Sequence, residues 1–250
     1  MYSVRPNLLM RKIYPSAIWR IVPLTGFSPD SPSRTDSAEQ GGGDGRGGQI
    51  FLRFDDGPVP EITPWVLDTL KKYDAKATFF CVGANIEKYP SVFQKIISEG
   101  HSIGNHTHNH LNGWKAKTKN YLENIALCNS AIKNYQSSVL GNRSNNHFLP
   151  INDQRSPLFR PPYGKLKRSQ YSILKSKYSL VMWDVLSGDF DQKLSEEKCL
   201  KNVLTKTREG SIVVFHDSIK AKKNLFYTLP KFLEHFSKKG FVFDCLPASP

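Results

Sequence analysis

Two adjacent carboxylates, Asp55 and Asp56, are the residues of this chain that most directly suggest chemistry. Bringing two acids together costs free energy unless a cation lies beside them. An apolar run, residues 50–52, leads into the pair, and Gly57-Pro58 forces a turn directly after it. The pair is therefore predicted at the tip of a buried strand, where barrel enzymes keep their reacting groups. A metal ion is the cation that this arrangement favours.

A pair of histidines supplies the other ligands in this prediction. In a helical turn, His106 and His110 would lie on one side and could bind one ion. Standing alone, this spacing is more often structural than metal-binding. The aspartate pair strengthens the case, because one Asp and two His leave an open fourth position, as in catalytic zinc sites. We expect His108 to point away from the ion and His101 to be a structural residue.

Three further motifs follow probable strand ends later in the chain. The first, residues 159–164, sets Arg160 beside two prolines that hold the backbone rigid. A fixed guanidinium suits the orientation of a carboxylate, although this motif alone could equally stiffen a loop. Asp189 and His216 also come shortly after predicted strands. Unrelated structural residues would not all fall at strand ends, so the coincidence predicts one active site on one face of a sheet or barrel.

The elements that must position these residues alternate in type along the chain. The strands are predicted at residues 50–55, 76–82, 178–183, 211–215 and 241–245. The helices are predicted at residues 63–73, 91–100, 121–135, 170–177, 196–206 and 225–236. Thr63 is the expected N-cap of the first helix, with a proline in its first turn. Alternation of this kind predicts an α/β domain with a parallel sheet, open or closed into a barrel.

The chain of 250 residues is long enough for one large domain, predicted at residues 49–250. An N-terminal arm, residues 1–24, and a Gly/Ser/Pro-rich insertion, residues 25–48, precede it. The insertion contains seven glycines and almost no large apolar residue. It cannot bury enough surface to offset its ordering entropy and is predicted to be flexible. A second irregular stretch, roughly residues 136–157, is predicted to be a surface loop.

Positive charge is concentrated in the second half of the chain. Residues 114–250 carry 23 Lys/Arg and 11 Asp/Glu, a net +12, whereas residues 49–113 have a net −1. This asymmetry indicates either attraction to an anionic polymer, phosphate or membrane surface, or a solvated lysine-rich surface. No basic stretch is interleaved with aromatic residues, so no nucleic-acid partner is expected. The four cysteines are far apart, which argues against a structural zinc site and favours free thiols in a reducing compartment.

The N-terminal arm lacks the form of an ordinary signal peptide. Its apolar run, residues 17–24, is interrupted by Arg20 and Pro23 and is too short to span a bilayer. The expected location is therefore cytoplasmic or peripheral to a membrane. The arm mixes basic and apolar residues and could lie on a membrane surface. Two prolines interrupt that pattern and favour packing on the domain instead.

Taken together, five motifs resemble those of the polysaccharide deacetylase family, the nodulation-deacetylase homology domain of carbohydrate esterase family 4. They appear in the family's order between about residues 50 and 242, at Phe54–Pro58, His106–His110, Arg160–Tyr163, Asp189-Phe190 and Val214–His216. The resemblance implies a distorted (β/α) barrel of parallel strands, fewer than eight, and removal of acetyl groups from an N-acetylated amino sugar or polysaccharide. An O-acetyl polysaccharide esterase and an inactive carbohydrate-binding homologue are the alternatives.

The same resemblance implies a role for each matched residue. A divalent metal, usually zinc in this family, would be held by Asp56, His106 and His110. Asp55 would be the general base that takes a proton from the attacking water. Arg160 would orient that base.

The remaining roles also come from the resemblance. His216 would be the general acid that protonates the leaving amine, with Asp189 as its partner. The backbone N–H of Tyr163 would help to stabilise the oxyanion. The residues that would bind substrate are Pro162, Tyr163, Trp183, Phe190 and Val214.

The chain departs from the family pattern at a few positions. Leu186 and Phe190 stand where Asp and Trp are usual, and Val214 replaces the usual Leu, which puts the identity of the substrate in doubt. Arg53 stands where Thr is usual, on the same strand face as Asp55. A cation inside a barrel needs a partner, so Arg53 is expected to pair with an interior acid or to alter the electrostatics of the site.

Overall fold

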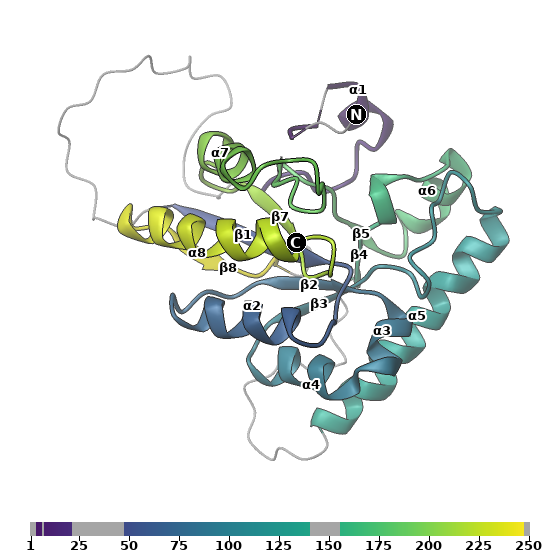
Figure 1. The fold of residues 1–250 in the computed structure, drawn as a ribbon. Coiled ribbons are helices and arrows are strands. Elements are labelled where there is room, and N and C mark those ends of the chain that lie inside the picture. Colours follow the sequence, from purple (N-terminus) through teal and green to yellow (C-terminus); the bar gives the residue numbers. More distant parts are fainter. Residues whose placement is uncertain (1–3, 7, 22–47, 141–155, 248–250) are drawn as a thin grey trace.

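A computed structural model describes residues 4–6, 8–21, 48–140 and 156–247 of the chain (Figure 1). In this part, eight strands form one sheet in which every pair is parallel. Their order is β5-β4-β3-β2-β1-β7-β6, and β8 pairs with the first residues of β1. The strands are β1 (Gln49–Asp55), β2 (Thr78–Cys81), β3 (Ser102–Asn105), β4 (Leu158–Phe159), β5 (Ser179–Leu180), β6 (Val185–Leu186), β7 (Ile212–His216) and β8 (Val242–Asp244).

Strand β1 occupies the centre of the sheet and determines where the chemistry lies. Every residue of β1 after Gln49 is buried, as expected for a parallel strand covered on both faces. Its register sets Asp55 beside Phe80 of β2 on one side and beside His216 of β7 on the other. The carboxyl ends of β1 and β7 therefore present their side chains at the same edge of the sheet.

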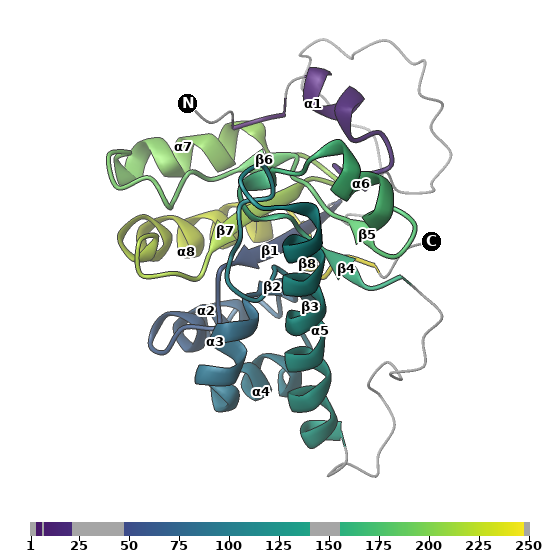
Figure 2. The ribbon, with the colours of Figure 1, turned by 90° about the vertical axis from the view of Figure 1, so that its right-hand side faces the viewer.

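The helices are α1 (Leu8–Ile13), α2 (Ile62–Lys71), α3 (Gly83–Lys88), α4 (Pro90–Ser98), α5 (Thr118–Leu140), α6 (Arg168–Leu174), α7 (Glu196–Lys206) and α8 (Lys222–Lys238). All but the short α1, which lies away from the strands, surround the curved sheet (Figures 1 and 2). The main core lies between strands and helices, where Phe54 stacks with Phe79 at 5.1 Å and with Phe215 at 6.0 Å between ring centroids. The predicted α/β fold, a distorted barrel of parallel strands, is confirmed: seven strands follow one another around the curve, and the eighth, β8, lies off this path and pairs only with β1.

Two predicted element boundaries are wrong. Helix α2 begins at Ile62 with Glu61 at its N-cap, so Thr63 lies inside the helix. The Thr63 hydroxyl instead donates to Asp217 Oδ2 at 2.6 Å, because that buried carboxylate needs a donor. The loop predicted at residues 136–157 starts too early, since α5 continues to residue 140. Residues 141–155, and the predicted insertion as far as residue 47, lie outside the described part of the chain.

The N-terminal arm packs on the domain and contacts both edges of the curved sheet. Ile18 pairs with Val181, directly beyond β5 at one edge. At the other edge, the carbonyl oxygen of Val4 accepts a hydrogen bond from the Leu186 N–H of β6 at 2.8 Å. Trp19 is buried between these contacts. Across the described ranges, no helix has the length and apolar character needed to cross a membrane. All four cysteines are unpaired.

Candidate active site

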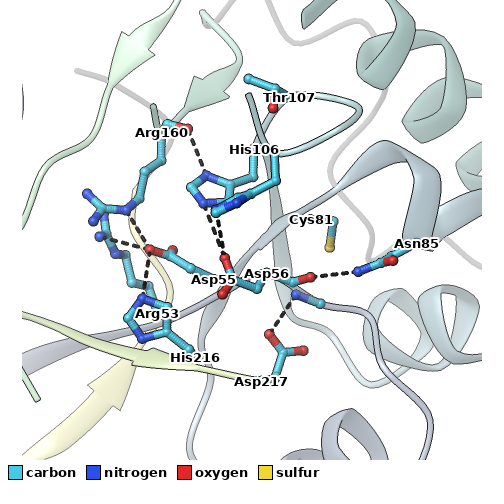
Figure 3. Close-up of polar contacts among 12 residues, drawn as sticks. Arg53, Asp55, Asp56, Cys81, Asn85, His106, Thr107, Arg160, His216 and Asp217 are labelled. Atoms are coloured by element: carbon cyan, nitrogen blue, oxygen red, sulfur yellow. Dashed lines mark hydrogen bonds and ion pairs between the residues drawn. The ribbon is translucent and has the colours of Figure 1, made fainter. Parts of the chain in front are cut away.

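Three residues at the edge formed by the strand ends could hold a metal ion. Ligand atoms of Asp56, His106 and His110 all lie within 4.8 Å of one another. Asp56 Oδ1 is 3.1 Å from His110 Nε2. It is 3.6 Å from His106 Nε2 (Figure 3). One carboxylate and two imidazoles with room for a further ligand are the donor set of a catalytic divalent site.

The surroundings of His106 fit this assignment. Its Nδ1 lies 2.8 Å from the carbonyl oxygen of Arg160, which can only accept, so Nδ1 carries the proton. Nε2, the nitrogen facing Asp56, is then left with its lone pair free for an ion. A hydrogen bond of this kind from the distal nitrogen is the usual support of a metal-binding histidine. Asn85 Nδ2 also donates to the Asp56 carbonyl oxygen at 2.8 Å. The residues present therefore fit a divalent ion.

The two histidines converge through a loop, and the predicted helical turn is wrong. Residues 106–110 form no helix, and Thr107 and His110 have left-handed backbone angles, with φ of 63° and 52°. Two asparagines hold this loop in place. Asn105 Oδ1 accepts from the Thr107 N–H at 2.8 Å, and Asn124 Oδ1 accepts from the N–H of residues 108 and 109 at 2.9 Å. Neither asparagine is predictable from the sequence, since Asn105 ends strand β3, Asn124 lies on helix α5, and neither position carries a local signal for such a role.

The other two nearby histidines lie outside the cluster. His108 Nε2 lies 3.7 Å from Glu87 of helix α3. His101 is buried, its Nδ1 accepts from the Ala77 N–H at 3.2 Å, and burial lowers its pKa to about 4. A neutral imidazole that accepts a backbone hydrogen bond is a structural residue, as predicted.

Asp55 is buried beside the metal ligands and receives two guanidinium groups on one oxygen. Its Oδ2 lies 2.5 Å from Arg160 Nε and 3.3 Å from Arg53 Nη2. Its other oxygen, Oδ1, is buried without a hydrogen-bond partner. Burial raises the pKa of this carboxyl, but Arg160 and then Arg53 outweigh that effect and bring the pKa to about 2. Asp55 is therefore ionised at any ordinary pH. Its Oδ2 is fixed by the two guanidinium groups, and its Oδ1 has no hydrogen-bond partner.

His216 is held on the opposite side of the same site. Its Nδ1 lies 2.8 Å from Asp189 Oδ1, and its backbone N–H donates to Asp189 Oδ2 at 2.7 Å. Burial lowers the pKa of His216, yet the charge and hydrogen bond of Asp189 outweigh it and raise the pKa to about 9. The imidazole is thus protonated at neutral pH. Its Nε2 lies 4.0 Å from Asp55 Oδ2, so a candidate acid and a candidate base face one small space (Figure 3).

Arg53 has the interior partner that its position requires. The side chain has no exposed surface, and its partner is Asp55 itself. Nη1 donates to the carbonyl oxygen of Met182 at 2.5 Å, and the guanidinium lies 5.4 Å from the ring centroid of Phe80. Burial and the neighbouring Arg160 both lower the pKa of Arg53, and Asp55 raises it. Arg53 therefore acts on the same carboxylate oxygen as Arg160.

The five residues predicted to bind substrate differ in access. Tyr163 is 58% exposed, has a left-handed φ of 60°, and its ring lies 4.7 Å from that of His110. Phe190 packs edge-on against His216 at 4.9 Å and is partly exposed. Pro162 and Trp183 are buried, with Trp183 beneath the Arg160 guanidinium at 5.4 Å. Val214 has no exposed surface, so a substrate would reach it only if neighbouring side chains moved.

A second buried acid, Asp217, was given no role from the sequence. Its oxygens accept from the Gly57 N–H at 3.0 Å and from the Thr63 hydroxyl, so it ties the end of β7 to the turn after Asp56. Burial raises the pKa of Asp217 to about 8. A side chain at residue 57 would collide with this carboxylate, which explains why glycine follows the acid pair. The only available signal was its place directly after His216 at a strand end.

Known proteins resemble this chain over most of its length. A family model described as polysaccharide deacetylase matches residues 42–178. A peptidoglycan-N-acetylglucosamine deacetylase of Bacillus cereus is 32% identical over 202 residues, which cover 80% of this chain and 67% of that protein. A chitooligosaccharide deacetylase of Azorhizobium caulinodans is 30% identical over 170 residues, 67% of this chain and 73% of that protein.

Solved structures agree with the sequence relatives. A crystal structure of a peptidoglycan N-acetylglucosamine deacetylase superposes with a TM-score of 0.68 at 29% identity, covering 81% of this chain and 90% of the other. A pseudoenzyme of carbohydrate esterase family 4 from Bacillus anthracis, 20% identical, shares the fold with a TM-score of 0.64 and covers 80% of this chain and 64% of that one. The fold alone therefore does not establish catalysis, which depends on the residues of the site.

Proposed function

This chain belongs to the polysaccharide deacetylase family, and on that premise we propose that it hydrolyses the N-acetyl groups of an N-acetylated amino sugar or polysaccharide and releases acetate. One observation carries the proposal. The metal-binding cluster lies next to a carboxylate with one open oxygen and opposite a protonated imidazole. Hydrolysis of an amide needs this combination, because the nucleophile must lose a proton and the departing amine must gain one. The names of the relatives support peptidoglycan or a chitin-type oligosaccharide as the substrate.

Asp55 would be the general base, because its carboxylate is fixed in orientation beside the metal-binding residues. A divalent ion bound by Asp56, His106 and His110 would supply Lewis-acid chemistry that activates water and polarises the acetyl carbonyl. Asp55 would then accept the proton of the attacking water at Oδ1, the oxygen without a partner. Its Oδ2 is fixed by guanidinium groups, so the carboxylate cannot rotate away.

The acid acts from the other side. His216 would donate the proton on Nε2 to the leaving amine as the C–N bond breaks. Asp189 holds Nδ1 and keeps the ring charged until that step. The backbone N–H of Tyr163, the residue whose ring lies 4.7 Å from that of His110, would donate to the oxyanion. The products would be acetate and a free amino sugar.

We propose zinc as the ion, since two imidazoles and one carboxylate form a donor set that suits zinc. Adding single metals to chelator-treated protein, followed by measurement of acetate release, would identify the ion. Highest activity with a metal other than zinc would contradict this choice.

The function is tested by acetate release from matched substrates. We expect release from N-acetylated oligosaccharides in wild-type protein and none above background in an Asp55→Asn control prepared in the same way. O-acetylated polysaccharide tested in parallel separates the esterase alternative, and hydrolysis of esters alone would overturn the proposal. Binding of sugar without turnover of either substrate would favour the inactive homologue.

A further inference from the structure

A pocket that the proposed reaction does not use lies at the start of α8, where Asn224 contacts the loop that carries Asp189. Its volume is about 540 Å³, within the range of roughly 300–1,000 Å³ that is usual for small-molecule sites. It is lined by Lys220, Lys222, Lys223, Ile219, Asn224 and Phe226, among others. Ile219 follows His216 by three residues, so this part of the lining lies on the segment that leaves the carboxyl end of β7.

Asn224 fixes this pocket relative to the catalytic machinery. The residue is 2% exposed, and its Nδ2 donates to the carbonyl oxygens of Asp191 and Leu194 at 3.2 Å and of Asp189 at 3.4 Å. The first turn of α8 is thereby tied to the loop that carries the partner of the catalytic histidine. Asn224 Oδ1 has no hydrogen-bond partner within the described residues. A buried acceptor left unpaired favours a ligand that brings a donor, such as a sugar hydroxyl.

The lining residues of the pocket carry three ammonium groups and no carboxylate. Lys222 Nζ lies 3.6 Å from Glu61 Oε2, and Lys223 Nζ lies 4.0 Å from Glu196 Oε2. These pairs are long and partly exposed, so they neutralise little of the charge. Lys220 makes no ion pair with any described residue. The concavity therefore concentrates positive potential next to the reacting groups, in the half of the chain that carries the net charge of +12.

The walls also offer apolar surface to a ring. Phe226 stacks on Trp65 with ring centroids 3.8 Å apart, which holds its ring in place. Ile219, also in the lining, is 76% exposed. Apolar walls with a few polar groups are typical of sites that bind a sugar or another small ring. The compact charge of a lysine pairs with either a carboxylate or a phosphate.

We propose that this pocket is a subsite for an anionic sugar unit, carrying a carboxylate or a phosphate ester, next to the unit that is deacetylated. The inference rests on the proposed function and names its substrate class, an acidic N-acetylated glycan. The lysines would contribute to binding and not to the chemical step, because none of them is among the reacting groups. Removing them should therefore raise KM for an acidic substrate and leave kcat unchanged.

The test compares three N-acetylated oligosaccharides of equal length, one neutral, one with a carboxylate and one with a phosphate ester. We expect the Lys220→Ala/Lys223→Ala double variant to raise KM for one or both acidic substrates by about tenfold, as two partly exposed ion pairs would. KM for the neutral substrate should stay within about twofold. Added salt should weaken the wild-type preference for acidic substrates, and the variant, which keeps only Lys222, should show a smaller dependence on salt. Lys133→Ala on α5, remote from the pocket, is the matched control.

The outcomes distinguish failure of the proposed subsite from failure of the proposed function. Deacetylation that is equally efficient on neutral and acidic substrates, in wild type and variant alike, overturns the subsite and leaves the proposed function intact. If no substrate releases acetate, the proposed function fails. The subsite is then tested by titration calorimetry with the same three oligosaccharides. Preferential binding of an acidic one, lost in the double variant, supports it, and equal binding overturns it. The two acidic substrates distinguish carboxylate from phosphate.

Discussion

Arg53 and Asp55 lie two residues apart on strand β1, and Arg53 Nη2 lies 3.3 Å from Asp55 Oδ2, the oxygen that also faces Arg160 Nε. Two buried cations therefore share one carboxylate oxygen. The same guanidinium of Arg53 donates to the Met182 carbonyl, directly before Trp183. Arg53 thus connects Asp55, the candidate base, to the segment that contains Trp183, the residue whose ring packs against the Arg160 guanidinium. The net positive charge of this trio suits a carboxylate that must stay ionised until it accepts a proton.

Replacing Arg53 tests this relationship. We expect Arg53→Met to lower kcat by about tenfold, because Asp55 loses one of the two groups that orient it. The acidic limb of the pH–rate profile should move to higher pH. The reason is that Arg53 helps to lower the pKa of Asp55 to about 2, and its loss lets that pKa rise.

The conservative variant provides the control. Arg53→Lys keeps the charge but not the fork that reaches both Asp55 and Met182, so its kcat should lie between those of wild type and Arg53→Met. Identical kcat values and pH profiles in all three proteins would show that Arg53 only fills space.

Asp55→Asn should separate catalysis from metal binding. We expect kcat to fall by at least about 100-fold, since the variant lacks the general base. The metal-to-protein ratio should stay unchanged, because Asp55 is not among the residues of the cluster. The measurements are acetate release and elemental analysis of the same preparation. Asp56→Asn is the counterpart and should lose both metal and activity. An Asp55→Asn protein with wild-type turnover would refute the assignment of the base.

Asp189 should set the basic limb of the pH–rate profile. His216 has its pKa raised to about 9, mainly by Asp189, so wild-type activity should fall as pH rises through about 9. Asp189→Asn removes the negative charge that stabilises the protonated His216 ring. The pH at which activity falls should therefore move down toward 6.5, the ordinary pKa of histidine.

Stability should follow the same linkage. A raised folded-state pKa contributes stability that is fully present below 6.5 and is lost as pH rises through about 9. Asp189→Asn should remove this pH dependence from denaturant unfolding curves. An unchanged pH–rate profile in the variant would mean that His216 is not the group that titrates.

Chelation should abolish turnover without unfolding the protein. The three ligands lie at the edge of the sheet, and none of them belongs to the hydrophobic core clusters. We therefore expect acetate release to disappear on chelation and to return on addition of zinc, while the far-ultraviolet circular dichroism spectrum stays the same. Full activity in protein shown to be metal-free would contradict the ligand set.

Trp19 should be important to the stability of the domain, despite its place outside the predicted catalytic unit. It is 7% exposed and packs against Trp183 at 5.7 Å between ring centroids. Trp19→Ala should lower the free energy of unfolding by about 3 kcal/mol, a typical cost for truncating a buried tryptophan. Leu9→Ala is the control, because Leu9 is 65% exposed and its loss should change stability by less than about 0.5 kcal/mol. The free energies of unfolding of the two variants are measured in urea. Equal values would show that Trp19 of the arm contributes nothing to the stability of the domain.

Much of the candidate site is predictable from the sequence. Motifs at the ends of strands such as β1 and β7 must meet, because all strands of a parallel sheet present their carboxyl ends at one edge. That reasoning brings Asp55 and His216 together, and the register confirms it by pairing them directly. Helical periodicity also predicts most of the helices, and α7 (Glu196–Lys206) has the predicted bounds, whereas α3 (Gly83–Lys88) was not predicted.

The rest depended on contacts between distant parts of the chain. The spacing of His106 and His110 is compatible with a helix. Hydrogen bonds with Asn105, with Asn124 of α5 and with the backbone at the end of β2 and the start of α3 hold it as a loop instead. The partner of Arg53 and the role of Asp217 likewise depend on which groups are buried beside them. Periodicity and spacing report the local backbone, so they place a side chain at a strand end. Which polar groups then satisfy one another in a site sheltered from water is decided by tertiary packing, because a buried charge must find a partner wherever the fold provides one.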